Sequence, residues 1–226
     1  MRSWQHSLFS RKRTLKSTWK LRVPTFAAVV LVVALTRGFW VAQIGRSLVC
    51  VEDLGHTDLM LIENYNPEYI LFERAAALEQ AGVAPRALVP VQASGDPEIP
   101  NPVSSGIAEL MARQARLKNW ATVPIREVEP IRLNVASQIR DHLAGDRIKS
   151  LTVVTAGLNS RRSTLVYRTV LGQTGPRVNC APVFGSTTPE RWAETWHGVQ
   201  AVTEEFVKLQ YYRFYVLPFV ARSRVS

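Results

Sequence analysis

The hydrophobic pattern divides the chain into an apolar N-terminal stretch and a longer region in which short apolar runs alternate with amphipathic segments. Runs of four to eight apolar residues are typical of buried strands, and apolar residues at i, i+4 and i+8 are typical of helices. Strands are predicted at 58–62, 86–91, 122–125, 148–155 and 178–183. Helices are predicted at 67–80, at 104–119 with Ser104 or Ser105 as the cap, at 130–143, at 159–171 and from 188 onward. This alternation predicts an α/β fold: a Rossmann-like, mostly parallel sheet with helices on both faces.

The last predicted helix has a strong start signal. Thr188, Pro189 and Glu190 offer a cap, a proline at the first helical position and an acid in the first turn. We therefore expect a long amphipathic helix to begin there. The aromatic tail at 211–220 is too short to cross a membrane, and we expect it to pack on the domain or to lie near a bilayer surface.

The N-terminal apolar stretch predicts a membrane anchor. We divide the chain into a basic cytoplasmic segment at 1–22, one transmembrane helix at 23–44 and an extracytoplasmic domain at 45–220. Arg37 interrupts the span, but an arginine near a helix end can reach the headgroups. A cleaved signal peptide and a buried core helix remain alternatives, since the uninterrupted apolar run is shorter than a typical span.

The charge distribution supports this orientation. The chain has 28 basic and 18 acidic residues, a net charge of +10, and eight of the basic residues lie in the first 44 positions, before the first acid at Glu52. Positive charges before a span are typical of the cytoplasmic side. The remaining region is close to neutral, so we expect the lipid bilayer as a partner, the cell inner membrane as the location and no nucleic-acid binding.

Cys50 and Cys180 are the two cysteines. Outside the cytoplasm they can pair, but we favour two buried, unpaired thiols, because one follows the membrane segment and the other lies in a predicted strand. Their spacing fits no metal site, and the sequence suggests neither a metal nor a cofactor.

A candidate anion site follows the best central strand. Ligands of parallel sheets bind at the carboxyl ends of the strands, here the loops at 63–66, 92–103, 126–130, 156–161 and 184–188. In the 156–161 loop a predicted helix begins, and its N-terminus favours an anion. Asn159, Ser160, Arg161 and Arg162 are the candidate ligand-binding residues there, with an arginine holding a phosphate or carboxylate. Solvated arginines at a helix start are the alternative.

A second candidate region runs from Glu127 to Gln138 (EVEPIRLNVASQ). Glu129 is the candidate acid/base and Asn134 a further ligand-binding residue, although a carboxylate before a helix also suits capping. No P-loop, dinucleotide-binding, nucleophile-elbow or HExxH motif occurs.

The layout resembles the YdcF/SanA/ElyC-type family of membrane-anchored bacterial envelope proteins. The resemblance rests on the basic N-terminus, the single span, the RSLVCVEDLGHTDLMLI stretch, and the match of Glu129, Asn134, Thr155 and Arg162 to family positions. The family's glycine cluster is replaced by Glu63-Asn64-Tyr65-Asn66, and its histidine by Asn159. The resemblance implies an α/β domain that serves cell-envelope biogenesis, with degenerate motifs.

We therefore predict a single-pass membrane protein whose domain serves cell-envelope or surface-polysaccharide biogenesis by binding an anionic ligand or a membrane-protein partner. Two alternatives stay open. One is a small hydrolase or transferase for a phosphorylated or nucleotide-like envelope precursor, and the other is a non-catalytic scaffold. Because the family-like motifs are degraded, we favour a protein without catalytic activity.

Overall fold

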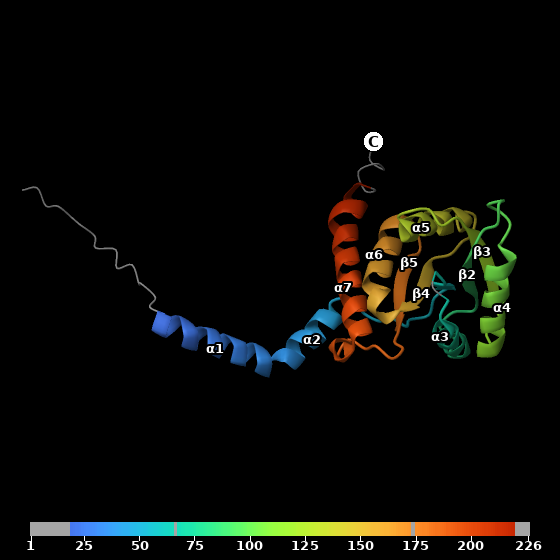
Figure 1. The fold of residues 1–226 in the computed structure, drawn as a ribbon. Helices are drawn as coiled ribbons and strands as arrows, with labels where there is room; N and C mark the ends of the chain where they lie inside the picture. The colour runs from blue at the N-terminus through green and yellow to red at the C-terminus, as the bar shows by residue number, and fades with distance from the viewer. Residues whose placement is uncertain (1–18, 66, 173–174, 220–226) are drawn as a thin grey trace, which may run out of the picture. The chain divides into compact units, whose positions relative to one another are not determined.

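A computed structural model describes residues 19–65, 67–172 and 175–219 (Figure 1). The chain forms two units, residues 1–39 and residues 40–226. The basic segment predicted at 1–22 lies almost entirely outside the described residues. The compact unit thus begins at residue 40, a few residues before the predicted domain start at 45.

The N-terminal unit contains the helix α1 (Trp19–Leu35), and a second helix, α2 (Arg37–Arg46), begins after Thr36. From Val23 onward the large apolar side chains of α1 are exposed. Within the described ranges no single helix has the length and apolar character to cross a bilayer, whereas Val23–Leu35 and Arg37–Arg46 meet those criteria together as a bent pair. The predicted uninterrupted helix over 23–44 is therefore two helices.

The second unit is built on a sheet of five parallel strands in the order β3-β2-β1-β4-β5. The strands are β1 (Leu59–Ile62), β2 (Ala87–Gln92), β3 (Trp120–Ile125), β4 (Ser150–Ala156) and β5 (Arg177–Val183). Each pairing between two of these strands is parallel. The predicted α/β class and the parallel sheet are confirmed, and the architecture is Rossmann-like.

Helices cover both faces of the sheet (Figure 1). They are α3 (Tyr69–Gln80), α4 (Pro102–Ala115), α5 (Ile131–His142) and α6 (Ser160–Leu171), and α7 (Trp196–Tyr211) packs on α6. Successive residues of a strand point to opposite faces. Leu59 and Leu61 accordingly pack against α5 and α6, while Met60 and Ile62 pack against α3 and α4. Strands buried on both faces explain the continuous apolar runs in the sequence.

Two predicted helix starts are wrong. Asn101, not Ser104 or Ser105, caps α4, and its side chain accepts hydrogen bonds from the backbone N–H groups of Val103 and Ser104. The second wrong start is that of α7, which begins at Trp196 with Thr195 as its cap.

Tertiary packing explains the late start of α7. A Cβ atom on Gly45 would lie 2.2 Å from the carbonyl oxygen of Pro189, so the 188–190 segment runs directly against the end of α2. Arg46 also pairs with Glu190 at 3.1 Å. These contacts hold as a loop a segment that local propensity would make helical.

The C-terminal segment packs on the domain, as one of the two predicted options had it. A π-helix, Tyr212–Val216, continues α7, and Tyr212, Val216 and Leu217 are buried in the cluster on the α5–α6 face. Phe214, Tyr215 and Phe219 remain exposed.

Cys50 and Cys180 form a disulfide, with Cα atoms 6.5 Å apart. The prediction of two unpaired thiols is therefore wrong. The backbone N–H of Asp53 donates to the carbonyl of Cys180 at 3.1 Å, and that of Cys50 donates to the Ser160 hydroxyl at 2.9 Å. The segment after α2 is thus held against β5 and the start of α6, which the sequence pattern does not reveal.

Candidate functional site

The strand order places a topological switch point between β1 and β4. The chain moves outward from β1 to β2 and β3, then returns to the other side of β1 as β4. In open α/β sheets, ligands bind beyond the carboxyl ends of the strands at such a point. The segments that follow β1, β3 and β4 contribute polar side chains at this point, and α7 adds Glu205 and Lys208.

Glu63, directly after β1, is a buried carboxylate at this point. One of its oxygens, Oε2, accepts a hydrogen bond from the Ser163 hydroxyl at 2.7 Å and another from Thr155. The other oxygen, Oε1, is buried and has no hydrogen-bond partner among the described residues. Arg132 Nε lies 3.7 Å from Oε1, close enough for an ion pair but not for a hydrogen bond.

Arg162, in the first turn of α6, forms a buried bidentate ion pair with Glu205 of α7. Its Nε donates to Glu205 Oε2 at 3.1 Å, and its Nη2 donates to Oε1 at 2.9 Å. Only 8% of the Arg162 side chain and 11% of the Glu205 side chain are exposed. The guanidinium also lies 5.4 Å from the centre of the Tyr212 ring, a cation–π contact.

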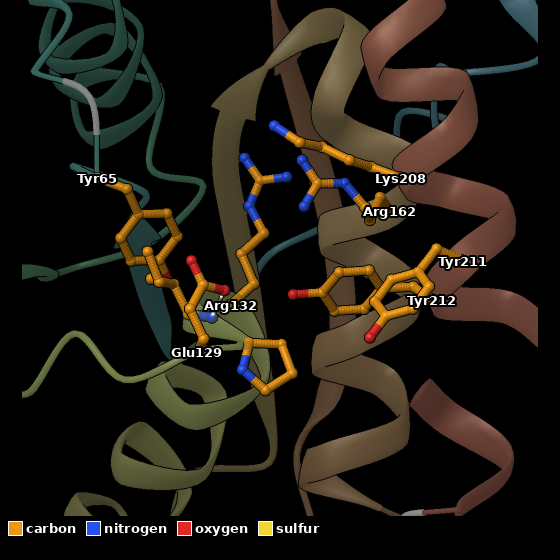
Figure 2. A pocket seen from close by; sticks show the side chains of 9 residues that line it. Tyr65, Glu129, Arg132, Arg162, Lys208, Tyr211 and Tyr212 are labelled. Carbon is orange, nitrogen blue, oxygen red and sulfur yellow. Dashed lines mark hydrogen bonds between the residues drawn. The ribbon is translucent and has the colours of Figure 1, made fainter. Parts of the chain in front are cut away.

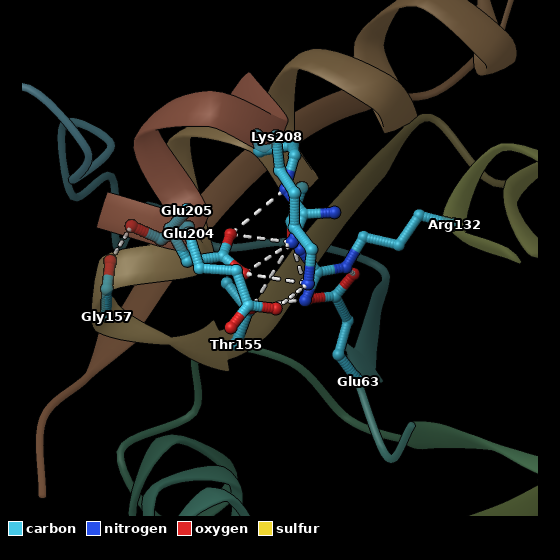
Figure 3. Close-up of polar contacts among 10 residues, drawn as sticks. Glu63, Arg132, Thr155, Gly157, Glu204, Glu205 and Lys208 are labelled. Carbon is cyan, nitrogen blue, oxygen red and sulfur yellow. Dashed lines mark hydrogen bonds and ion pairs between the residues drawn. The ribbon is translucent and has the colours of Figure 1, made fainter. Parts of the chain in front are cut away.

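Arg132 links the two carboxylates through Asn159. With its amide oriented to satisfy both neighbours, Asn159 donates to Glu205 at 3.2 Å and accepts from Arg132 Nη2 at 3.1 Å. Arg132 Nη1 is buried and has no hydrogen-bond partner in the described part of the chain. We call Glu63, Arg132, Asn159, Arg162 and Glu205 the arginine–glutamate cluster (Figure 3).

Burial and mutual repulsion perturb the two arginines. Burial, and then the positive charge of Arg132, lowers the pKa of Arg162. Burial also opposes the charge of Arg132, but the carboxylates of Glu63 and Glu205 outweigh it and raise the pKa of Arg132. Both groups remain charged, since an arginine keeps its proton in proteins. Two like charges held together in a site are a recurrent feature of functional sites.

Two members of the cluster, Arg132 and Arg162, line a pocket of about 610 Å³ (Figure 2). In Figure 2 the guanidinium groups of Arg132 and Arg162 lie next to each other at the pocket. Lys208 of α7 adds a third cation, and its ammonium group pairs with Glu204 and Glu205. Further lining residues are Tyr65, Glu129, Pro130, Ile131, Tyr211 and Tyr212.

A second cavity, of about 100 Å³, adjoins the larger pocket at Tyr65 and Arg132, which line both. Its other lining residues include Glu63, Glu68, Thr155 and Asn159. Burial, followed by the charge of Glu63, raises the pKa of Tyr65 well above the usual tyrosine range. Its hydroxyl therefore stays protonated and serves as a neutral hydrogen-bonding group.

Three of the residues predicted from sequence lie at these cavities. Glu129 and Arg162 line the larger pocket and Asn159 lines the smaller one. Glu129 is exposed, and its carboxylate accepts from the backbone N–H of Ile131 at 3.4 Å, a capping contact. Glu129 is therefore placed both to cap α5 and to face a ligand.

The other three have structural contacts. The Asn134 amide donates to the Val128 carbonyl at 2.9 Å, the fully buried Ser160 hydroxyl accepts from the Cys50 N–H, and Arg161 Nη1 donates to the Ser47 carbonyl at 2.8 Å. None of these three residues lines either cavity. Arg161 and Arg162 are neighbours in sequence, yet they point to different parts of the molecule.

Sequence reasoning missed Glu63, Arg132 and Glu205 as site residues. Glu63 had a usable signal: a carboxylate directly after a buried strand, in a loop already predicted to face ligands. Arg132 and Glu205 lie inside helices, where a single charged residue is normally a surface residue. No local pattern distinguishes them.

No group of three or more His, Cys, Asp or Glu side chains that could hold a metal ion is present among the described residues. No family model, curated protein or solved structure matches the chain.

Proposed function

We propose that the domain binds an anionic group between Arg132 and Arg162, at the carboxyl ends of β1 and β4. The observation that carries this proposal is the pair of adjacent, largely buried guanidinium groups on the wall of a pocket. Bringing two cations together in a buried place is unfavourable unless negative charge compensates it. A phosphate or carboxylate between them accepts paired hydrogen bonds from guanidinium groups.

The carboxylates already present leave donors for such a ligand. Glu205 engages Nε and Nη2 of Arg162, while Glu63 forms no hydrogen bond with Arg132. Arg132 Nη1 is buried and without a partner in the described chain, and a buried donor without a partner costs about 1–3 kcal/mol. An incoming anion supplies an acceptor for one of the two N–H groups of that nitrogen, and Lys208, which pairs with Glu204 and Glu205, lines the same pocket.

We further propose that this domain is extracytoplasmic and anchored in the inner membrane by residues 23–44. The basic N-terminal residues, the bent pair of apolar helices and the Cys50–Cys180 disulfide support this location. The role in cell-envelope or surface-polysaccharide biogenesis rests on the resemblance given above. In spheroplasts with an intact inner membrane, added protease should degrade the domain. Full protection of the domain would contradict the proposed orientation.

An enzymatic alternative is favoured by one observation, the exposed carboxylate of Glu129 at the same pocket as the arginine pair. In that case Glu129 is the acid/base for a phosphorylated or nucleotide-like envelope precursor. Substituting Glu129 by Gln would then abolish turnover and leave the binding of inorganic phosphate intact. In the binding proposal this substitution has no effect beyond a small change at the start of α5.

The binding proposal is tested by titrating the full chain in detergent with inorganic phosphate and following its Tm and its heat of binding. Phosphate should raise the Tm of the wild type. Phosphate should leave the Tm of Arg132→Met unchanged, and likewise that of the double variant Arg162→Met/Glu205→Leu. The double variant removes both partners of the ion pair, so that Glu205 is not left unpaired. Arg113→Met is the matched control, because Arg113 is an exposed arginine that pairs with Glu109 and lines neither cavity. An equal response in all four proteins would overturn the proposal.

A further inference from the structure

The small cavity beside Arg132 carries an unusual pair of unsatisfied polar atoms. Glu63 Oε1 is a buried acceptor without a donor, and Arg132 Nη1 is a buried donor without an acceptor, among the described residues. Both side chains line the cavity of about 100 Å³. Figure 3 shows the Glu63 carboxyl group directed toward the guanidinium of Arg132.

These atoms specify the chemistry of what fills the cavity. A carboxylate needs a donor and a guanidinium needs an acceptor. A hydroxyl group can donate one hydrogen bond and accept another at the same time. Water also satisfies both atoms, but the cavity adjoins the larger pocket at Tyr65 and Arg132, so a ligand held in the pocket lies beside it.

Size restricts the ligand further. A water molecule occupies about 30 Å³, so about 100 Å³ accepts a few hydroxyl-sized groups. The larger pocket, of about 610 Å³, has room for a sugar ring and its anionic substituent. Tyr65, Tyr211 and Tyr212 line it, and tyrosine combines a broad apolar face with a polar tip.

Together, these features lead us to infer that the ligand is an anionic sugar, with its phosphate or carboxylate between Arg132 and Arg162 and a ring hydroxyl in the cavity between Glu63 and Arg132. This inference rests on the proposed function, since it names the ligand class of the same site. Glu63 is then the residue that selects a hydroxylated ligand. The hydroxyls of Thr155 and Ser163 hold its other oxygen in place.

The experiment compares ligands that share the anion and differ in the hydroxyl groups. The full chain in detergent is titrated by calorimetry with inorganic phosphate, glucose 1-phosphate, cyclohexyl phosphate, glucuronate and adenosine monophosphate. Cyclohexyl phosphate has a ring and a phosphate but no ring hydroxyls. We expect glucose 1-phosphate or glucuronate to bind at least tenfold more tightly than cyclohexyl phosphate, and the comparison of those two sugars identifies the anion.

The variant Glu63→Gln keeps the shape of the side chain and removes the carboxylate. It should abolish the preference for the sugar over cyclohexyl phosphate, because the loss of the charge beside Arg132 affects the binding of both anions alike and only the sugar loses its hydroxyl contact. Glu73→Gln, at an exposed glutamate of α3, is the control and should behave as the wild type. Circular dichroism and Tm establish that each variant is folded, and the ligand comparison in the wild type tests the inference without any variant.

The possible failures are distinguishable. If inorganic phosphate and both sugars fail to bind, the proposed function itself is wrong. If phosphate binds but glucose 1-phosphate and cyclohexyl phosphate bind equally, the anion site stands and the sugar inference is overturned, the small cavity then holding water only. Tighter binding of adenosine monophosphate than of either sugar also overturns it.

Discussion

The two apolar clusters that flank the sheet and the arginine–glutamate cluster at its carboxyl end are both buried, but they affect stability differently. In the apolar clusters, side chains such as Leu61 and Phe72 are fully buried, and burial stabilises the fold by roughly 25 cal/mol per Å² of apolar surface. In the arginine–glutamate cluster, desolvation of the charges offsets their attraction. Two of its polar atoms have no hydrogen-bond partner in the described chain.

This difference indicates which region is built for folding and which for a ligand. A buried ion pair contributes no more to stability than apolar residues of the same size. Charged groups that persist at a switch point of the sheet, beside a pocket, are therefore best explained by what they bind. The four predictions below test this contrast.

The largest effect should come from breaking one ion pair. Glu205→Ala leaves Arg162 buried and unpaired, and we expect a loss of about 3–5 kcal/mol of unfolding free energy. The double variant Arg162→Met/Glu205→Leu should recover to within about 1 kcal/mol of the wild type or exceed it, because it removes both charges. Urea unfolding of the full chain in detergent measures both values. A double variant as unstable as the single one would show that this pair is needed for folding.

An apolar truncation should lower the stability of the fold without affecting the binding of phosphate. Leu61→Ala removes a fully buried side chain from the β1 core, and we expect a loss of about 3 kcal/mol. Phosphate affinity should change less than threefold, since Leu61 lines neither cavity. Unfolding and calorimetric titration provide the two readouts. A loss of phosphate binding in a folded Leu61→Ala protein would show that the apolar clusters and the arginine–glutamate cluster do not act independently.

Removing the disulfide should give an effect of similar or smaller size. The bond joins residues separated by 130 positions. A disulfide typically contributes about 2–4 kcal/mol to the free energy of unfolding. Cys50→Ser/Cys180→Ser should be destabilised by that amount and should no longer respond to reductant. The wild type treated with dithiothreitol should match the variant. An identical unfolding curve for wild type and variant would contradict the pairing.

The smallest effect should appear at the amino end of β1, opposite Glu63. Asp58 accepts backbone hydrogen bonds from Lys149 and Ser150 at 2.8 and 2.9 Å, and the bond from Lys149 in particular lowers its pKa. A lowered folded-state pKa contributes stability above the unfolded value of about 3.9, and this stability is lost as the pH falls through the folded value. Asp58→Asn should therefore be less stable than the wild type at pH 7, with the difference shrinking below about pH 4. If the difference in unfolding free energy did not change with pH, the charge of Asp58 would not be its cause.

Local patterns predicted much of this fold because they reflect local physics. The IKSLTVVT run at 148–155 covers all of β4 except Ala156, and the spacing of Ile131, Val135 and Ile139 marks the buried side of α5. These signals come from the two-residue and 3.6-residue periods of strands and helices. The start of α7 escaped prediction because Pro189 packs against Gly45, a contact between distant parts of the chain.

The candidate site shows the same division. Its location at the carboxyl ends of the strands follows from the parallel topology, and Arg162 and Asn159, chosen on that ground, each line a cavity. Ser160 and Arg161, chosen by the same argument, contact the segment after α2 instead. Which of several polar neighbours faces the pocket depends on the direction of each side chain in the packed structure.

By itself, the sequence determined the order of strands and helices and the parallel α/β class, and it predicted a site at the carboxyl ends of the strands. Only the tertiary structure decided that Arg132 meets Glu63, that Arg162 meets Glu205 and that Cys50 pairs with Cys180. The reason is the range of the interactions. Periodicity records neighbours a few residues apart, whereas these partners lie 43 to 130 residues apart in the chain and meet only after the sheet has formed.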